Sequence, residues 1–236
     1  TRFQGLCDKY GVPTVMASAE EILNHTERVT RTGIAEIPDG VYRFVDYFDS
    51  EQLEKPLKLQ VKITVQKDEM DLDFAGNPPQ VRAGLNIVWT ALVATVYYAI
   101  KTVIGPTILP NAGMYRPIRV SAPEGSIVNC VHPAAIGNRS NTCQRIVDLI
   151  HGALASAVPD RIIAACNGTL SSLNISGVNP LTGDYYAYIE TTGGGSGARA
   201  TKDGLNGVHV HITNTSNLPV EALESEYPLM VDRYEL

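Results

Sequence analysis

The residues best suited to chemistry lie between positions 188 and 219, in the stretch YIETTGGGSGARATKDGLNGVHVHITNTSNLP. His209 and His211 alternate with valine. On a strand, both imidazoles would point to one face and could bind a single metal ion. No third ligand is marked nearby, and hydrogen bonds to Thr213 and Asn214 would explain the same pattern without a metal. The metal-binding and the structural interpretation both stay open.

Three consecutive glycines, Gly193, Gly194 and Gly195, precede these histidines and continue into SGARA. This is a loose form of the dinucleotide-binding fingerprint, which needs a helix to begin at its last glycine. A second glycine-bearing turn at 202–207 would break such a helix, and no G-x-x-x-x-G-K-[ST] pattern occurs, so we expect no nucleotide site. Either the loop approaches a ligand or partner closely, or it is a crowded turn or β-bulge.

Other reactive side chains carry weaker signals. Cys143, Cys166 and Ser140 are possible nucleophiles, but no G-x-S-x-G elbow or comparable signature distinguishes one of them. His151 is expected on an amphipathic helix beside its apolar stripe, which favours a structural role. The residue types alone therefore leave the chemistry open.

Composition narrows the possible partners. The chain has 236 residues, 44% of them hydrophobic, a net charge of −6, and no run of Lys or Arg. Nucleic acid and anionic membranes are therefore not expected as partners. The four cysteines are far apart and form no C-x-x-C pair, which is typical of reduced thiols and favours a cytoplasmic location. The uncharged run at 83–100 is interpreted as a buried helix and not as a membrane span.

Periodicity then predicts the elements that position these groups. Apolar residues at helical spacing predict amphipathic helices from Pro13 and over 141–158, with the buried helix near 85–104 between them. Alternation predicts a strand at 41–48 and a hairpin over 57–74 that turns at Lys67-Asp68.

The rest of the chain is expected to alternate short strands with turns. Extended segments are predicted near 108–109 and 118–120, and a short helix near 219–224. Four further strands are predicted within 161–177, 185–195, 207–215 and 227–236. The predicted fold class is α+β, mixed, in one domain over 1–236, with mostly antiparallel short strands and two or three amphipathic or buried helices.

Several longer segments resemble one family. YIETTGGGSGAR, the segment DGLNGVHVHITNTSNLPVEALESEYPLMVDRYEL, ILPNAGMYRPIRVSAPEGSIVN and PAAIGNRSNTCQRIVDLIHGALASAVPDR are all similar to the hydantoinase B family. This family comprises the B-type subunits of ATP-dependent N-methylhydantoinases, 5-oxoprolinases and related ketone carboxylases. The similarity runs from about Ile34 to Leu236.

The resemblance implies a subunit that works with a hydantoinase A-type partner. That partner would bind ATP and phosphorylate the oxygen of a cyclic amide, and the B-type subunit would complete the hydrolysis. Family members carry a metal-binding segment of the Thr-His-Leu-Pro-Asp type that is absent from these residues. We therefore expect this chain to be the central part of a larger subunit, with the ligands of any divalent metal outside it.

The resemblance also implies site residues. His209, His211 and Asn214 match the family's His-x-His-x-Thr-Asn pattern, and we expect them to be catalytic. The expected substrate-binding residues are those of the glycine loop and of the start of the 141–158 helix, namely Thr192, Gly193, Gly194, Gly195, Asn141, Thr142 and Gln144. Thr142 and Gln144 are expected behind the site.

Three functions stay open. The first is part of an ATP-dependent cyclic amide hydrolase, and the second is a subunit of an acetone- or acetophenone-type carboxylase. The third is a non-catalytic scaffold whose glycine loop and uncharged helix form an interface. We place the hydrolase first, because the hydrolases form the broader branch and no residue marks a carboxylase.

Overall fold

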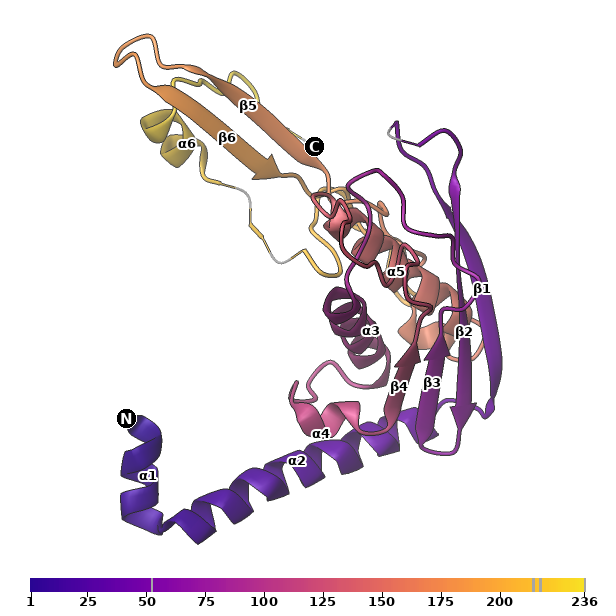
Figure 1. The fold of residues 1–236 in the computed structure, drawn as a ribbon. Helices are drawn as coiled ribbons and strands as arrows, with labels where there is room; N and C mark the ends of the chain where they lie inside the picture. Colours follow the sequence, from indigo (N-terminus) through magenta and orange to yellow (C-terminus); the bar gives the residue numbers. More distant parts are fainter. Residues whose placement is uncertain (52, 214, 217, 236) are drawn as a thin grey trace.

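The computed structural model describes the chain except for residues 52, 214, 217 and 236 (Figure 1). The helices are α1 (Arg2–Tyr10), α2 (Val12–Ala35), α3 (Trp89–Ile104), α4 (Ala112–Tyr115), α5 (Arg139–Leu154) and α6 (Val220–Glu226), with a 3-10 turn at Pro159–Arg161. The strands are β1 (Gly40–Phe48), β2 (Leu57–Gln66), β3 (Glu69–Asp73), β4 (Ile118–Ser121), β5 (Ser172–Val178) and β6 (Tyr185–Thr191). The mixed α and β class with mostly antiparallel strands is confirmed.

The larger sheet has the strand order β1-β2-β3-β4. β1 and β3 both pair antiparallel with β2, and β4 pairs parallel with β3. The predicted hairpin is confirmed, since β2 and β3 are separated only by Lys67 and Asp68. Alternation gives β2 one dry face, formed by Leu59, Val61, Ile63 and Val65.

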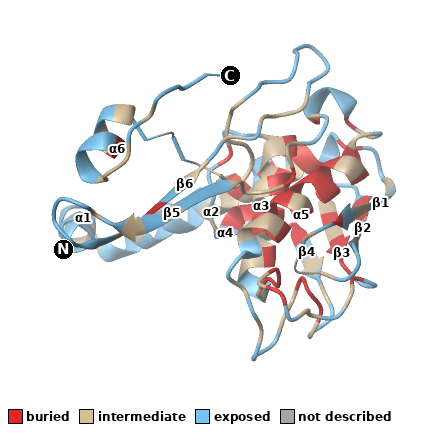
Figure 2. Cartoon of the chain, turned by 90° about the horizontal axis from the view of Figure 1, so that it is seen from above, coloured by how far each residue is buried: buried red, intermediate tan, exposed pale blue. Residues whose placement is uncertain are grey.

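Helix α5 covers that dry face, and α3 lies beyond it (Figure 2). α5 packs on β1 and β2, and α3 packs on α5. The predicted buried helix is α3, which begins at Trp89 and buries residues at a spacing of three and four, among them Leu92, Val96, Ala99, Ile100 and Val103. No helix in the described part of the chain is long and apolar enough to cross a bilayer.

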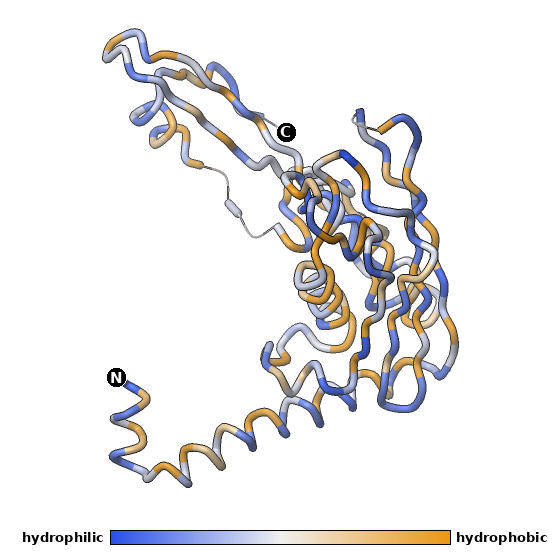
Figure 3. Tube along the Cα trace, viewed as in Figure 1, coloured by the Kyte–Doolittle hydropathy of each residue, from blue (hydrophilic) through white to orange (hydrophobic). Residues whose placement is uncertain are grey.

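Two parts extend away from this core (Figure 1). One is the arm formed by α1 and α2, and α1 was not among the predicted helices. The inner end of α2 is held to the β2–β3 turn by ion pairs of Arg31 with Asp68 and Glu69, at 3.3 Å each. Hydrophobic stretches recur along the arm, and Phe3, Leu6 and Met16 are exposed there (Figure 3).

The other extension is the hairpin of β5 and β6 with α6 beside it (Figure 1). The predicted helix near 219–224 is confirmed as α6, and the strand predicted within 185–195 is confirmed as β6. The strand predicted within 161–177 is confirmed only from Ser172 onwards, as β5.

The predicted strands at 207–215 and 227–236 are wrong: their described residues form loops and turns. Backbone hydrogen bonds connect the chain at the start of the 207–215 segment to the glycine run instead. Ser196 and Leu205 bond to each other, and the Gly195 N–H donates to the carbonyl of Val208. His211 has a φ of +52°, in the left-handed region, which ends any extended run. The segment near 108–109 is also not a strand, whereas that near 118–120 is β4.

Candidate functional site

A pocket of about 660 Å³ opens between α3, the start of α5 and the loop at 211–213. Its walls combine small apolar groups with hydroxyls, a guanidinium and an imidazole. The lining residues are Ala91, Ala94, Thr95 and Tyr98 of α3, Arg139, Ser140 and Cys143 of α5, and His211, Ile212 and Thr213 of the loop. A pocket of this size suits a small-molecule ligand.

The start of α5 brings positive charge to the pocket wall. Arg139 and Ser140 are the first two residues of this 16-residue helix, and Asn138 before them makes no capping hydrogen bond with its side chain. Backbone N–H groups at a helix start carry partial positive charge and favour anions. The pocket can therefore receive a negatively charged group beside Arg139.

Below the loop, three side chains from separate segments meet. His211 Nε2 lies 2.9 Å from Asp148 Oδ1, and the Cys166 thiol donates to Asp148 Oδ2 at 3.2 Å. The side chains of His211 and Asp148 are only 3% and 4% exposed. Burial disfavours the charged Asp148 carboxylate, but the hydrogen bonds from His211 and Cys166 outweigh that effect and lower its pKa. An ionised carboxylate only accepts, so His211 Nε2 carries the proton.

The Cys166 thiol is not poised as a nucleophile. Burial raises its pKa to about 12, although the Gly168 N–H donates to its sulfur at 3.1 Å. Burial also raises the pKa of the Cys143 thiol in the pocket wall. Both thiols therefore stay protonated near neutral pH.

The loop that carries His211 is fixed from α5. Gln144 Nε2 donates to the carbonyl of Val210 at 3.0 Å and to Thr213 Oγ1 at 2.5 Å. These bonds lie on both sides of His211. Its backbone is in the left-handed region, which is unfavourable for a residue with a side chain and needs neighbouring contacts to hold it.

A second buried histidine lies beside the first. His151 is 5% exposed, and its ring is 5.3 Å from that of His211 in an edge-on arrangement. Its Nε2 lies 2.9 Å from Thr102 Oγ1, and that hydroxyl donates to the carbonyl of Ala99. The hydroxyl must accept from the imidazole, which leaves His151 Nδ1 unprotonated. Burial lowers the pKa of His151 to about 4, so the ring is neutral.

The glycine run supports this loop from behind. A Cβ on Gly193 would lie 2.5 Å from the carbonyl oxygen of Gly207, and one on Gly194 would lie 2.1 Å from the Asn167 amide nitrogen. Gly195 has a φ of +99°. The close approach that glycine permits is thus made to the chain itself. Among the described contacts, the run packs on the segment that leads into His211.

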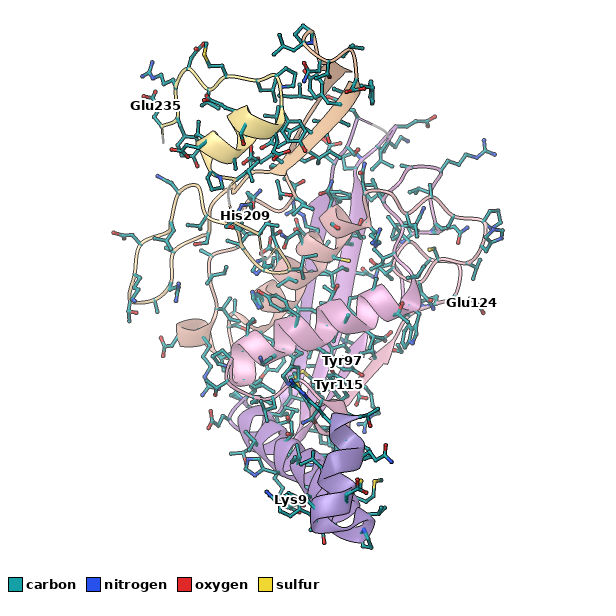
Figure 4. The ribbon with its side chains drawn as sticks, turned by 90° about the vertical axis from the view of Figure 1, so that its left-hand side faces the viewer. Lys9, Tyr97, Tyr115, Glu124, His209 and Glu235 are labelled. Carbon is teal, nitrogen blue, oxygen red and sulfur yellow. The ribbon has the colours of Figure 1, made fainter. Side chains whose placement is uncertain are left out.

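The other predicted site residues that the structure describes do not line the pocket. Asn141 accepts from the Leu170 N–H at 2.8 Å, and the Thr142 hydroxyl donates to the Leu85 carbonyl at 2.6 Å. Thr192 is exposed after the end of β6. His209 lies on the loop between the helices and the hairpin, above α3 in Figure 4.

Asn214 is outside the described residues. Among the residues expected to be catalytic or substrate-binding that the structure describes, only His211 lines the pocket.

Sequence reasoning did not connect Asp148 and Cys166 with His211. For Asp148 a signal existed, because an acidic residue sits among the apolar positions of a predicted buried face and needs a partner there. Cys166 lies in an irregular segment, and no local pattern marks its contact with a helix 18 residues earlier.

The chain is similar to proteins of one known family. A model of the hydantoinase B/oxoprolinase family matches residues 1–236. A protein of Pseudomonas sp. strain NS671, provisionally named as the B component of a D-/L-hydantoinase, is 33% identical over 248 residues, which cover 100% of this chain and 41% of that protein. The chain thus spans about two fifths of the length of this relative.

Two solved structures share the fold. The ATP-dependent caprolactamase from Pseudomonas jessenii superposes with a TM-score of 0.81 at 24% identity, covering 98% of this chain and 41% of that one. Nucleotide-free acetone carboxylase superposes with a TM-score of 0.83 at 17% identity, covering 96% and 33%. With the family model matched from the first residue to the last, this chain belongs to the hydantoinase B/oxoprolinase family.

Proposed function

We propose that this chain forms the substrate pocket of an ATP-dependent cyclic amide hydrolase of the N-methylhydantoinase or 5-oxoprolinase type. The observation that carries the proposal is the pocket of about 660 Å³, lined by Arg139 and by the His211 that is hydrogen-bonded to Asp148, in a chain that matches this family throughout. The proposal treats the chain as the central part of a B-type subunit.

The pocket suits an activated lactam better than the lactam itself. An unstrained amide carbonyl is a weak electrophile, and phosphorylation of its oxygen would supply a leaving group. The product of that step is anionic, and the Arg139 guanidinium and the partial positive charge at the start of α5 would favour such an anion. The small side chains of Ala91 and Ala94 leave room for an apolar ring.

The residues around His211 would orient the attack of water. Asp148 holds the imidazole through Nε2, and Gln144 holds the backbone on both sides of it. We retain His209 and Asn214 as further catalytic candidates on this loop. Asn141 and Thr142 would position the α5 end of the pocket through their bonds to Leu170 and Leu85.

Thr192 and the triple glycine, proposed for substrate binding, would act through the loop against which the glycines pack.

The proposed reaction requires an ATP-binding partner subunit and further parts of the B-type polypeptide. ATP would be bound by a hydantoinase A-type subunit, and the remainder of the B-type polypeptide would complete the site, with any family metal. A cytoplasmic location agrees with four free cysteines.

The test uses the full-length B-type polypeptide with its A-type partner. We expect Arg139→Gln and His211→Ala to lower lactam hydrolysis by about 100-fold or more, while the ATP turnover of the partner partly survives. Arg2→Gln, on the exposed surface of α1, is the matched control and should leave hydrolysis unchanged. Unchanged lactam turnover in both pocket variants would remove the pocket from the reaction.

The second candidate is ATP-dependent ketone carboxylation. The fold is shared with acetone carboxylase as well as with caprolactamase, so the fold does not choose between the two reactions. An activity panel of hydantoin, 5-oxoproline and acetone, each with ATP and with or without bicarbonate, separates them. Bicarbonate-dependent consumption of acetone, with both cyclic amides untouched, would favour the carboxylase.

A further inference from the structure

One buried cluster combines the three ligand types that a transition metal prefers. Asp148 comes from α5, Cys166 from the segment before β5, and His211 from the loop after β6. Their ligand atoms, a carboxylate oxygen, a thiol sulfur and an imidazole nitrogen, all lie within 4.8 Å of one another. We propose that Asp148, Cys166 and His211 bind a divalent transition-metal ion of the Zn²⁺ class.

The separations suit such an ion. Ligand atoms about 2.0–2.3 Å from a tetrahedral zinc ion lie roughly 3.2–3.7 Å apart. The Cys166 sulfur lies 3.2 Å from Asp148 Oδ2, and His211 Nε2 lies 2.9 Å from the other carboxylate oxygen, Oδ1. Small side-chain movements would therefore bring all three atoms to coordination distance.

The donor set selects the metal. Thiolate with imidazole and one carboxylate favours zinc and similar ions, whereas magnesium and calcium require oxygen ligands. Three protein ligands leave a fourth position of the tetrahedron open, which is the arrangement of catalytic and not of closed structural zinc sites. The open position would hold water.

His151 supplies an independent observation at the same place. Its Nδ1 is buried and has no hydrogen-bond partner among the described residues. The ring contacts that of His211 and lies on the same helical face as Asp148, three residues earlier. An unpaired buried nitrogen is costly, and water bound to the ion would give it a donor.

The backbone agrees with a site built around His211. Its left-handed φ of +52° is sparsely populated by residues with side chains and concentrates at functional sites. Gln144 fixes this turn from both sides, so the imidazole is placed toward Asp148 before any ion arrives. Such a preorganised ligand loses little freedom on binding.

Metal binding and simple hydrogen bonding differ in the state of the thiol. Without an ion, the Cys166 thiol keeps its proton and donates it to Asp148 Oδ2. With an ion, a metal–sulfur bond forms, the thiol proton leaves to solvent, and the Nε2 proton of His211 moves to Nδ1 so that Nε2 can coordinate. The thiolate–metal bond is therefore the signature to measure.

The metal cluster shares a residue with the proposed pocket, but metal binding does not require the proposed reaction. His211 belongs both to the cluster and to the pocket lining. Metal binding is measured without turnover, so a failure of either proposal is seen separately.

The experiment loads the full-length protein with Co²⁺ and records its absorption spectrum. We expect a thiolate-to-cobalt charge-transfer band that Cys166→Ser abolishes and His211→Ala weakens, with the Kd for Co²⁺ rising more than about tenfold. Cys143→Ser is the matched control, because Cys143 is a buried cysteine of α5 outside the cluster, and it should keep the band. A metal site elsewhere in the protein does not imitate a band that depends on Cys166.

Two outcomes would overturn the proposal. One is the absence of a charge-transfer band in the unmodified protein loaded with Co²⁺, and the other is a band that survives Cys166→Ser.

Discussion

The β2–β3 and β5–β6 hairpins have similar local sequence patterns but differ in how far their side chains are buried. In the β2–β3 hairpin, alternate residues such as Ile63 and Leu72 are fully buried in the core. In the β5–β6 hairpin, Tyr188 is buried but Tyr185 and Ile189 are about 70% exposed. Figure 2 shows the contrast as a buried core beside an exposed hairpin.

The difference lies in what covers each face. On one face of the second hairpin, Tyr227, directly after α6, packs 5.0 Å from Tyr188 by ring centroids. Its other face carries Val178, Tyr185 and Ile189 into solvent. A two-stranded hairpin alone is marginally stable, so this one depends on its few covering contacts. The pocket accordingly lies in the core, and the C-terminal region contributes to it only the loop after β6.

The largest effect should appear when one substitution is made in both hairpins. Ile63→Ala empties a fully buried position on β2 and should lower the free energy of unfolding by about 2–5 kcal/mol. Ile189→Ala removes a side chain that is 70% exposed and should change it by about 0.5 kcal/mol or less. Urea unfolding curves measure both. Equal losses would mean that the second hairpin is as well packed as the first.

The same contrast decides how far sequence could predict this fold. Helical and alternating periods suffice for α2, α3, α5 and the first three strands, because their residue types repeat at a helical or an alternating spacing. In α3, α5, β2 and β3 this spacing matches the buried face. The parallel pairing of β4 with β3 is not local, since β3 and β4 are joined through α3 and α4. The failed strand at 207–215 has alternating residues but a backbone turned by neighbouring glycines.

The candidate site is a harder case. His211 is found from a family pattern, whereas its partners depend on contacts across 63 and 18 residues of chain. Asp148 could have been suspected, because carboxylates are rarely buried without a partner. Cys166 could not, because a half-buried cysteine in an irregular segment resembles any other.

A glycine substitution tests whether the C-terminal region is tightly packed at its base even though its hairpin is open. Gly193→Ala would place a Cβ 2.5 Å from a backbone oxygen that cannot rotate away, so the segment at 205–208 must shift. We expect a loss of about 1–3 kcal/mol in the free energy of unfolding. Gly137→Ala is the control, since its added Cβ meets nothing within 4 Å. If both variants unfold alike, the base is looser than its contacts indicate.

The smallest effect concerns the one well-covered tyrosine of the second hairpin. The Tyr188 hydroxyl donates to Glu190 Oε2 at 2.6 Å, so Tyr188→Phe should cost about 0.5–1.5 kcal/mol, while Tyr185→Phe, at an exposed position, should cost nothing measurable. Burial, followed by the neighbouring Glu190 carboxylate, raises the pKa of Tyr188 to about 12, above the value near 10 of an unfolded chain. Its contribution to stability is therefore complete below pH ~10 and is lost as the pH rises toward 12. The deficit of Tyr188→Phe relative to the unmodified protein should shrink across that interval in urea unfolding, and a deficit independent of pH would place Tyr188 in solvent like its neighbour.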